Sequence, residues 1–188
     1  MRRVIFQNLT SVDGYFEGPA REIDWHNVDG EFNELAIDFL NSVDILLFGR
    51  VTYELMASYW PTPKAIADDP IVAGKMNSLS KVVFSRTMTK AVWTNTRVVN
   101  GNAVEEIRRL KQGAGKDIAI FGSSDLAVSV LHSDIIDEIR ILVNPIVLGG
   151  GKPLLHGIAG RLQLKLLGAR TFASGNVMLS YHPLPLSN

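Results

Sequence analysis

Short apolar runs recur along the chain, and amphipathic stretches separate several of them. The runs have the length of buried strands and are RRVIFQNL, DILLFG, KVVFS, TRVVN and DIAIFG. Strands that alternate with helices are typical of βαβ units, in which helices cover both faces of a largely parallel sheet. This alternation therefore predicts an α/β fold.

Two of the separating stretches carry apolar residues at helical spacing. These residues are Phe32, Leu35, Ala36, Phe39, Leu40 and Val43 in the first stretch, and Val104, Ile107 and Leu110 in the second. The least regular segment is WPTPKAIADDPIVAGKMNSL, within residues 60–80, which carries three prolines. We interpret that segment as a surface excursion from the fold.

The pattern changes after residue 134. The segments DEIRILVNPIVL, RLQLKLLGARTF and GNVMLSYHP read as strands, with little room for helices between them. We therefore expect antiparallel strands at the C-terminal edge of the sheet. With 188 residues, 46% of them hydrophobic, and no obvious linker, the chain predicts a single domain over residues 1–188.

The charge and cysteine content exclude several classes of protein. Lys plus Arg equals Asp plus Glu at 19 each, so the broad positive surface of a non-specific nucleic-acid or membrane binder is absent. Without cysteine there is no disulfide, thiolate nucleophile or cysteine zinc site. The N-terminus lacks a signal-peptide core, and no apolar run approaches the eighteen or so residues of a membrane span. We expect a soluble cytoplasmic protein that binds a small molecule.

Three predicted strands end in similar residues. In open α/β sheets ligands bind beyond the carboxyl ends of the parallel strands. Each of these ends offers small or hydroxyl residues, two offer an arginine, and two lead into a predicted helix. A helix N-terminus attracts anions, and glycine lets a phosphate approach the backbone closely. The three ends, which favour a phosphate site, are Gly49-Arg50-Val51-Thr52, Ser85-Arg86-Thr87 and Gly122-Ser123-Ser124-Asp125.

A simpler interpretation exists for each strand end. Thr52 and either Ser123 or Ser124 can be ordinary helix N-caps, with the arginines in solvent. For one strand end alone this interpretation is the commoner case, and only the three together favour phosphate binding.

Several catalytic signatures are missing from the sequence. There is no G-x-G-x-x-G after a strand, no Walker pattern before Gly151-Lys152, no G-x-S-x-G elbow and no H-E-x-x-H pair. The four histidines are scattered, so no metal site is predicted. The run Gly149 to Gly151 is consistent either with close approach to a ligand or with a turn between strands.

Five motifs follow one another in a characteristic order: TSVDG at residues 10–14, then LLFGRVTYE, VVFSR, IAIFGSSDL and IRILVNPIVLGGGKPLL. In order and spacing they resemble the dihydrofolate reductase superfold. The closer similarity is to the branch with the reductase domain of the bifunctional riboflavin-biosynthesis deaminase-reductase, where TSVDG resembles an S-x-D-G motif. The resemblance covers nearly the whole chain. It implies a three-layer αβα fold with a mixed, mostly parallel sheet and antiparallel C-terminal strands.

The resemblance implies that the chain binds NADPH and transfers a hydride to a small pterin-like, pyrimidine-like or other conjugated substrate. Arg50, Thr52, Ser85 and Arg86 would lie along the adenosine phosphate end, and the turn that begins at Gly122 would hold the pyrophosphate. The cofactor-binding residues implied are Gly49, Arg50, Thr52, Ser85, Arg86, Gly122, Ser123, Ser124 and Asp125.

Asp13 is the leading candidate for a catalytic residue, because the resemblance places the nicotinamide near the loop after the first strand. Its alternative is a turn role, since Asp-Gly forms turns and the carboxylate can bond local backbone. Dihydrofolate reductases carry a substrate-binding carboxylate on the first helix, and the stretch from Asp24 to Asn33 does not align cleanly with it. Asp24 is therefore a fallback candidate, and its alternative is an ordinary loop residue. The chain has neither the length nor the cysteines for a deaminase domain, so we interpret it as a stand-alone reductase domain.

Two other functions remain open from the sequence. The first is a nucleotide-binding protein on the same scaffold that has lost catalysis, and the weaker second is a structural domain that binds no nucleotide. The aromatic residues Trp25, Tyr53 and Trp60 favour the enzyme if they line a pocket, although Tyr53 and Trp60 also suit the core. The apolar C-terminal strands and the resemblance predict a homodimer.

Overall fold

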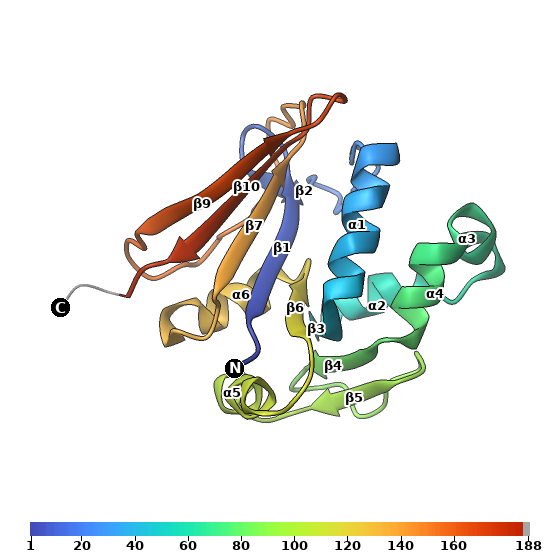
Figure 1. The fold of residues 1–188 in the computed structure, drawn as a ribbon, viewed down its shortest axis with the longest axis vertical. Helices are drawn as coiled ribbons and strands as arrows, with labels where there is room; N and C mark the ends of the chain where they lie inside the picture. The colour runs from blue at the N-terminus through green and yellow to red at the C-terminus, as the bar shows by residue number, and fades with distance from the viewer. Residues whose placement is uncertain (186–188) are drawn as a thin grey trace.

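The computed structural model describes residues 1–185 and contains one sheet of eight strands with helices on both faces (Figure 1). The strands lie in the order β5-β4-β3-β6-β1-β7-β10-β9. Their bounds are β1 Val4–Thr10, β3 Val43–Gly49, β4 Ser80–Phe84, β5 Thr96–Val99, β6 Asp117–Phe121, β7 Glu138–Val143, β9 Leu164–Thr171 and β10 Val177–Pro183. Two short strands, β2 (Tyr15–Glu17) and β8 (Lys152–Pro153), pair separately and are called the arm below.

The helices connect these strands. They are α1 Gly30–Ser42, α2 Arg50–Tyr59, α3 Pro63–Asp68, α4 Pro70–Ser78, α5 Ala103–Gln112, α6 Ser124–Val130 and the 3-10 turn η1 Leu131–Ser133. The predicted helices are thereby confirmed as α1 and α5. Val43, which we placed on the helical pattern, is instead the first residue of β3.

Alternation along the strands divides the core between the two faces of the sheet. In β1, Val4 and Phe6 pack into a core shared with α5 and α6, whereas Ile5 packs into a core shared with α1, α2 and α4. Successive side chains of a strand point to opposite faces, so a strand that is apolar throughout needs helices on both sides. The predicted three-layer α/β fold is confirmed.

The sheet is parallel from β5 to β7 and becomes antiparallel at its C-terminal edge. β10 runs antiparallel to both β7 and β9, as expected. β7 itself, which we grouped with the antiparallel segments, pairs in parallel with β1 from Ile5 opposite Glu138 to Thr10 opposite Val143. The reason is that α6 and η1 supply a crossover between β6 and β7, which a parallel connection requires.

The proline-containing segment 60–80, which we interpreted as the least regular part of the chain, is mostly helical. α3 and α4 each begin with a proline, Pro63 and Pro70. Thr62 Oγ1 accepts from the Ala65 N–H at 3.2 Å, and the carboxylate of Asp69 caps α4 in the same way. Proline at the first helical position costs no hydrogen bond, so these residues start helices rather than interrupt them.

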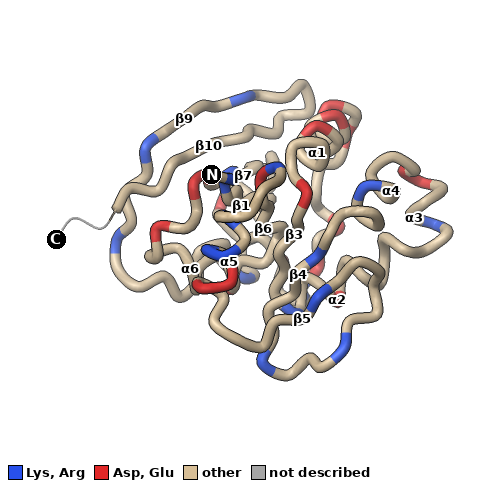
Figure 2. Tube along the Cα trace, turned by 60° about the horizontal axis from the view of Figure 1, so that its bottom comes forward, with Lys and Arg blue, Asp and Glu red and all other residues tan. Residues whose placement is uncertain are grey.

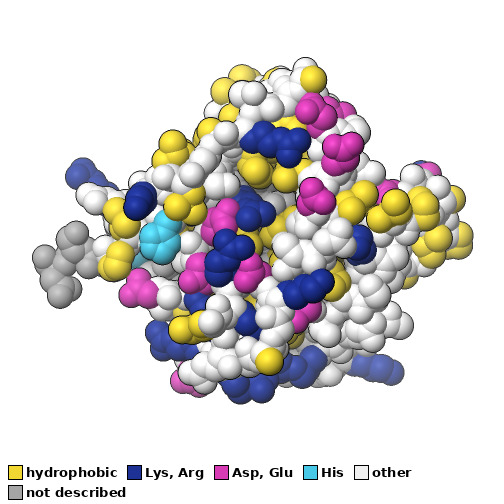
Figure 3. Space-filling view, viewed as in Figure 1, with side chains coloured by type: hydrophobic (Ala, Val, Ile, Leu, Met, Phe, Trp, Pro, Cys, Tyr) yellow, Lys and Arg dark blue, Asp and Glu magenta, His cyan; other side chains and the backbone are white. Residues whose placement is uncertain are grey.

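Lys and Arg are interspersed with Asp and Glu along the chain trace (Figure 2). The outer hairpin of β9 and β10 is the most open part of the sheet, and hydrophobic side chains reach the surface along it (Figure 3). On β9, Leu166 is 56% exposed and Leu167 is 53% exposed. Among residues 1–185, no helix combines the length and apolar character needed to cross a bilayer.

Candidate functional site

A crevice opens where two neighbouring strands lead the chain in opposite directions. β3 continues through α2 to β4, while its neighbour β6 continues through α6 to β7 on the other side of β1. α2 packs on one face of the sheet and α6 on the other. The connections after β3 and β6 therefore diverge at the carboxyl edge of the sheet, which is the usual ligand-binding place in an open α/β fold.

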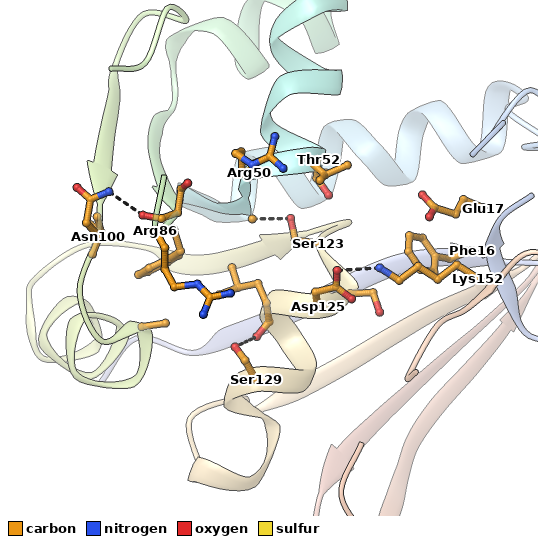
Figure 4. Close-up of a pocket in the computed structure, with 18 of the residues that line it drawn as sticks. Phe16, Glu17, Arg50, Thr52, Arg86, Asn100, Ser123, Asp125, Ser129 and Lys152 are labelled. Atoms are coloured by element: carbon orange, nitrogen blue, oxygen red, sulfur yellow. Dashed lines mark hydrogen bonds and ion pairs between the residues drawn. The ribbon is translucent and has the colours of Figure 1, made fainter. Parts of the chain in front are cut away.

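A cavity of about 700 Å³ occupies this crevice. It extends from the ends of β4 and β5, past α2 and α6, to the arm (Figure 4). Its lining residues are Phe16, Glu17, Arg21, Gly49, Arg50, Val51, Thr52, Phe84, Ser85, Arg86, Val99, Asn100, Gly101, Ala103, Ser123, Ser124, Asp125, Leu126, Ser129 and Lys152. Eight of the nine predicted cofactor residues are thus brought together around one cavity.

The hydroxyl groups at the strand ends do not serve as helix N-caps. Gly49 occupies the N-cap position of α2 and has no side chain to offer, so the first N–H groups of α2 have no side-chain partner. Ser123 occupies the N-cap position of α6, but its hydroxyl makes no cap bond and instead accepts a hydrogen bond from the Gly49 N–H at 2.9 Å. Ser124 Oγ donates to the Leu154 carbonyl. The simple capping interpretation is therefore wrong for Thr52, Ser123 and Ser124.

Gly122, the ninth predicted cofactor residue, lies behind the cavity wall. Its φ is +69°, and a Cβ at this position would lie 2.9 Å from Thr52 Cγ2. Asn8 Nδ2 also donates to its carbonyl at 3.0 Å. Only glycine fits this turn, because both the backbone conformation and the close approach of Thr52 exclude a side chain.

The two predicted arginines differ in their surroundings. Arg50 forms an ion pair with Glu54, one helical turn further along α2, at 2.8 Å. Arg86 also lines the cavity away from the arm (Figure 4), and no ion pair involves it within residues 1–185. Arg86 is therefore the more available of the two for an anionic ligand.

The loop after β4 is ordered by side chains of its own. Ser85 Oγ accepts from the Met88 N–H at 2.9 Å, and Asn100 Nδ2 donates to the Ser85 carbonyl at 2.7 Å. Asn100 follows β5, so it too lies at the carboxyl end of a parallel strand. The same rule that identified the other strand ends would have found Asn100 if it had been applied to TRVV.

The arm supplies the wall that the sequence did not predict. Phe16 and Glu17 of β2 and Lys152 of β8 line the cavity, and Arg21 follows them on the same side. Gly151 allows the two strands to meet, because a Cβ there would lie 2.2 Å from the Glu17 carbonyl oxygen and its φ is +133°. No local pattern links residues 16 and 152, and their approach is visible only in the folded chain.

Asp13 does not line the cavity. Its two carboxylate oxygens accept from the N–H groups of Leu148 and Gly149 at 3.1 and 2.8 Å, so the side chain ties the loop after β1 to the glycine run before β8. A hydrogen bond from the Ser11 side chain, together with the bonds from Gly149 and Leu148, lowers the pKa of Asp13 to about 2. The carboxylate is ionised and positions the arm.

The sequence of residues 2–178 matches the family model of the RibD C-terminal domain. The chain belongs to the RibD C-terminal domain family. The predicted resemblance is confirmed over nearly the whole chain, and the topology agrees with it.

Three known proteins illustrate the similarity. The "Uncharacterized protein YyaP" of Bacillus subtilis (strain 168) is 35% identical over 181 residues, which cover 96% of this chain and 95% of that protein. The crystal structure of a "Putative riboflavin biosynthesis protein" from Shewanella sp. PV-4 is 26% identical, with a TM-score of 0.74 over 97% of this chain and 99% of the other. A dihydrofolate reductase from Enterococcus faecalis has a TM-score of 0.62 at 14% identity, over 96% of each chain, and shows the shared fold.

Other residues considered from the sequence lie away from the cavity of this RibD C-terminal domain. Asp24 is exposed in a turn between the arm and α1. Tyr53 is 1% exposed, and its hydroxyl accepts from the Trp93 N–H at 2.9 Å, so it belongs to the core. Among the described residues, no group of three or more His, Asp or Glu side chains could hold a metal ion.

Proposed function

We propose that this chain is an NADPH-dependent reductase that transfers a hydride to a small pterin-like, pyrimidine-like or other conjugated substrate. The observation that carries the proposal is the cavity at the point where β3 and β6 diverge, lined by eight of the nine residues that the family resemblance assigns to NADPH. Membership of the RibD C-terminal domain family supports it. So does the E. faecalis dihydrofolate reductase of the same fold, whose structure is described as complexed with NADP(H).

The donor set suits a dinucleotide phosphate. Arg86 and Arg50 offer planar guanidinium groups at one end of the cavity, and the N-terminus of α2 presents backbone N–H groups without a side-chain cap. We assign the adenosine 2′-phosphate to the arginine end and the pyrophosphate to the turn from Gly122 to Asp125. The nicotinamide then extends toward the arm.

NADPH, when bound, supplies the hydride, and the protein supplies orientation and exclusion of water. Phe16 and Glu17 stand at the arm end of the cavity, where the reacting ring is proposed to lie (Figure 4). Asp13 acts on this end through the loop that it holds, because both its oxygens already accept backbone N–H groups. We therefore propose that Asp13 positions the arm for turnover.

The second candidate function is a nucleotide-binding protein on the same scaffold without catalysis. One observation favours it: Asp13, the acid predicted to stand beside the substrate, is not in the cavity. A reductase can function without such an acid, since hydride transfer is the cofactor's own chemistry. The two functions share the same binding site and differ only in turnover.

One experiment separates the candidates. NADPH is titrated into the purified protein, and binding is followed by quenching of the three tryptophans and by calorimetry. Oxidation of NADPH is then followed with a panel of dihydropterins, ribosylaminopyrimidinones, quinones and small carbonyl compounds. Binding with oxidation supports the reductase, and binding with no oxidation by any compound supports the inactive protein. Absence of binding rejects both and leaves a structural domain.

We also propose that two copies of the chain associate through the β9–β10 hairpin. β9 is the edge strand of the sheet and exposes Leu166 and Leu167. An exposed apolar edge is a liability that a partner surface removes. A second copy of this chain is present wherever the protein is made, so we propose it as the partner that covers this edge.

A further inference from the structure

Lys152 reaches across the mouth of the cavity from the arm to α6. Its Nζ lies 2.7 Å from Asp125 Oδ2 and 5.6 Å from the centre of the Phe16 ring (Figure 4). Lys152 belongs to β8, whereas Asp125 lies in the first turn of α6. The ion pair thus joins β8 to α6 at this end of the cavity, beside the hydrogen bond from Ser124 Oγ to the Leu154 carbonyl.

The position of Lys152 is built into the fold rather than set by the ion pair alone. Lys152 pairs with Glu17 in the arm, and the Leu154 N–H donates to the Gly14 carbonyl at 3.0 Å. Asp13 holds the preceding loop through the Gly149 N–H. These contacts fix the backbone from which the Lys152 side chain extends, so its amine stays within reach of this end of the cavity.

The neighbouring charges decide what this amine can bind. Glu17, Arg21, Asp125 and Lys152 are the charged residues that line this end of the cavity. The carboxylate of Asp125 stands directly after the turn assigned to the pyrophosphate. A phosphate next to a carboxylate is repelled unless a cation lies between them. Lys152 is the cation that already contacts Asp125.

The ion pair itself is a weak obstacle to exchange. The Asp125 side chain is 73% exposed and that of Lys152 is 33% exposed, and ion pairs this open to water contribute little to stability. The pyrophosphate as a whole carries more charge and more acceptor oxygens than one carboxylate, and charge-assisted bonds to it are strong. Asp125 can return to solvent when Lys152 turns to the phosphate.

We propose that Lys152 is a phosphate-binding residue of the dinucleotide site and that Asp125 is its counter-ion in the free protein. This inference rests on the proposed function, because it takes the cavity to be the dinucleotide site. It changes the role of Asp125, which the sequence assigned to cofactor binding. Lys152 binds the pyrophosphate, and Asp125 competes with the pyrophosphate for Lys152.

The two residues are tested by substitutions with opposite expected effects. Lys152→Gln removes a charged donor, so we expect NADPH binding to weaken by about ten- to a hundredfold. Asp125→Asn removes the competing carboxylate, so we expect NADPH to bind several times more tightly. Because the pyrophosphate is common to NADPH, NADH and ADP-ribose, each substitution should change the affinity for all three by the same factor.

A matched control is available on α3. Lys64 and Asp68 form an exposed Lys–Asp ion pair at 2.5 Å and do not line the cavity. Lys64→Gln and Asp68→Asn should therefore leave all three affinities unchanged. Equal melting temperatures for the wild type and the variants ensure that a loss of binding is not a loss of folding.

The outcomes separate this inference from the proposed function. The inference is overturned if Lys152→Gln changes the affinities by less than twofold, or if Asp125→Asn weakens binding as Lys152→Gln does. If the wild type binds ADP-ribose in a Lys152-dependent manner but binds neither NADPH nor NADH, the reductase proposal fails and the Lys152 site stands. If the wild type binds none of the three compounds, both are overturned.

Discussion

Asp13 accepts a hydrogen bond from the backbone N–H of Gly149 at 2.8 Å, across 136 residues of sequence. This contact joins the loop after β1 to the glycine run, and so places β2 and β8 side by side as one wall of the cavity. Asp13, which we predicted to lie beside the substrate, instead holds two backbone segments together.

Asp13→Asn should lower turnover more than NADPH affinity. The asparagine amide retains one acceptor oxygen for the two N–H groups that Asp13 now accepts, so the arm is held less firmly. The adenosine end of the cavity is far from this change and should bind as before. Steady-state kinetics with any substrate from the panel, beside calorimetry with NADPH, checks this, and equal turnover in the variant contradicts it.

Arg86→Ala should reduce the preference for NADPH over NADH. A charge-assisted bond to the 2′-phosphate contributes about 1.5–3 kcal/mol, so its loss should weaken NADPH binding by about ten- to a hundredfold and NADH binding less. Arg50→Ala should act in the same direction but less strongly, because Glu54 already neutralises Arg50.

Calorimetric titration of the wild type and both arginine variants with NADPH and NADH measures these effects. If the wild type binds both cofactors equally, or if each variant loses both in equal measure, neither arginine reads the 2′-phosphate.

Lys81→Met should destabilise the fold. Lys81 is 1% exposed, and its Nζ donates to the carbonyls of Met76, Asn77 and Leu79 at 2.8, 3.2 and 2.7 Å, where α4 ends. Methionine leaves these acceptors without a donor, so the free energy of unfolding should fall by about 1–3 kcal/mol. Urea titration measures it, with the exposed Lys64→Met as the control that should change little.

The Lys81 contribution should also depend on pH. Burial lowers the pKa of Lys81 to about 8, from its usual 10.5, so between these values the unfolded chain binds more protons than the folded one. Stability is therefore greatest above pH 10.5, where Lys81 is neutral in both states, and is lost as the pH falls through 8, because the folded protein takes up the proton less readily than the unfolded chain. The unfolding free energy of wild type minus that of Lys81→Met should rise with pH across this window, and a constant difference would show that the pKa is not lowered.

The protein should be a dimer in solution, and Leu166→Asp combined with Leu167→Asp should make it a monomer. Both leucines are more than half exposed on β9, so the substitutions place charge at the proposed interface without opening the core. Light scattering at micromolar concentration gives the mass. A monomeric wild type contradicts the prediction, and Ile66→Asp on the exposed side of α3 is the control that should keep the dimer.

Local sequence patterns predicted the elements well where burial imposes a period. The apolar runs became β1, β3, β4, β5 and β6. For the inner strands the reason is that a strand covered on both faces must be apolar along most of its length. The helical spacing from Phe32 to Leu40 likewise became α1. The helices of segment 60–80 were not predicted, because its prolines were read as loop signals. Thr62 and Asp69 stand just before two of these prolines and are N-caps.

The sequence by itself determined the helix layers and the cluster of glycine, hydroxyl and arginine residues at the strand ends, because these depend on short-range periodicity and on the parallel direction of the strands. It also determined the family, through the order and spacing of five motifs. Only the tertiary structure decided that Lys152 faces Asp125, that Glu54 neutralises Arg50 and that Asp13 is occupied by the backbone of Gly149. A side chain's partner depends on which segments the fold brings within hydrogen-bond distance. For Asp13 and Lys152 those segments are distant in the sequence, so local sequence patterns do not predict these contacts.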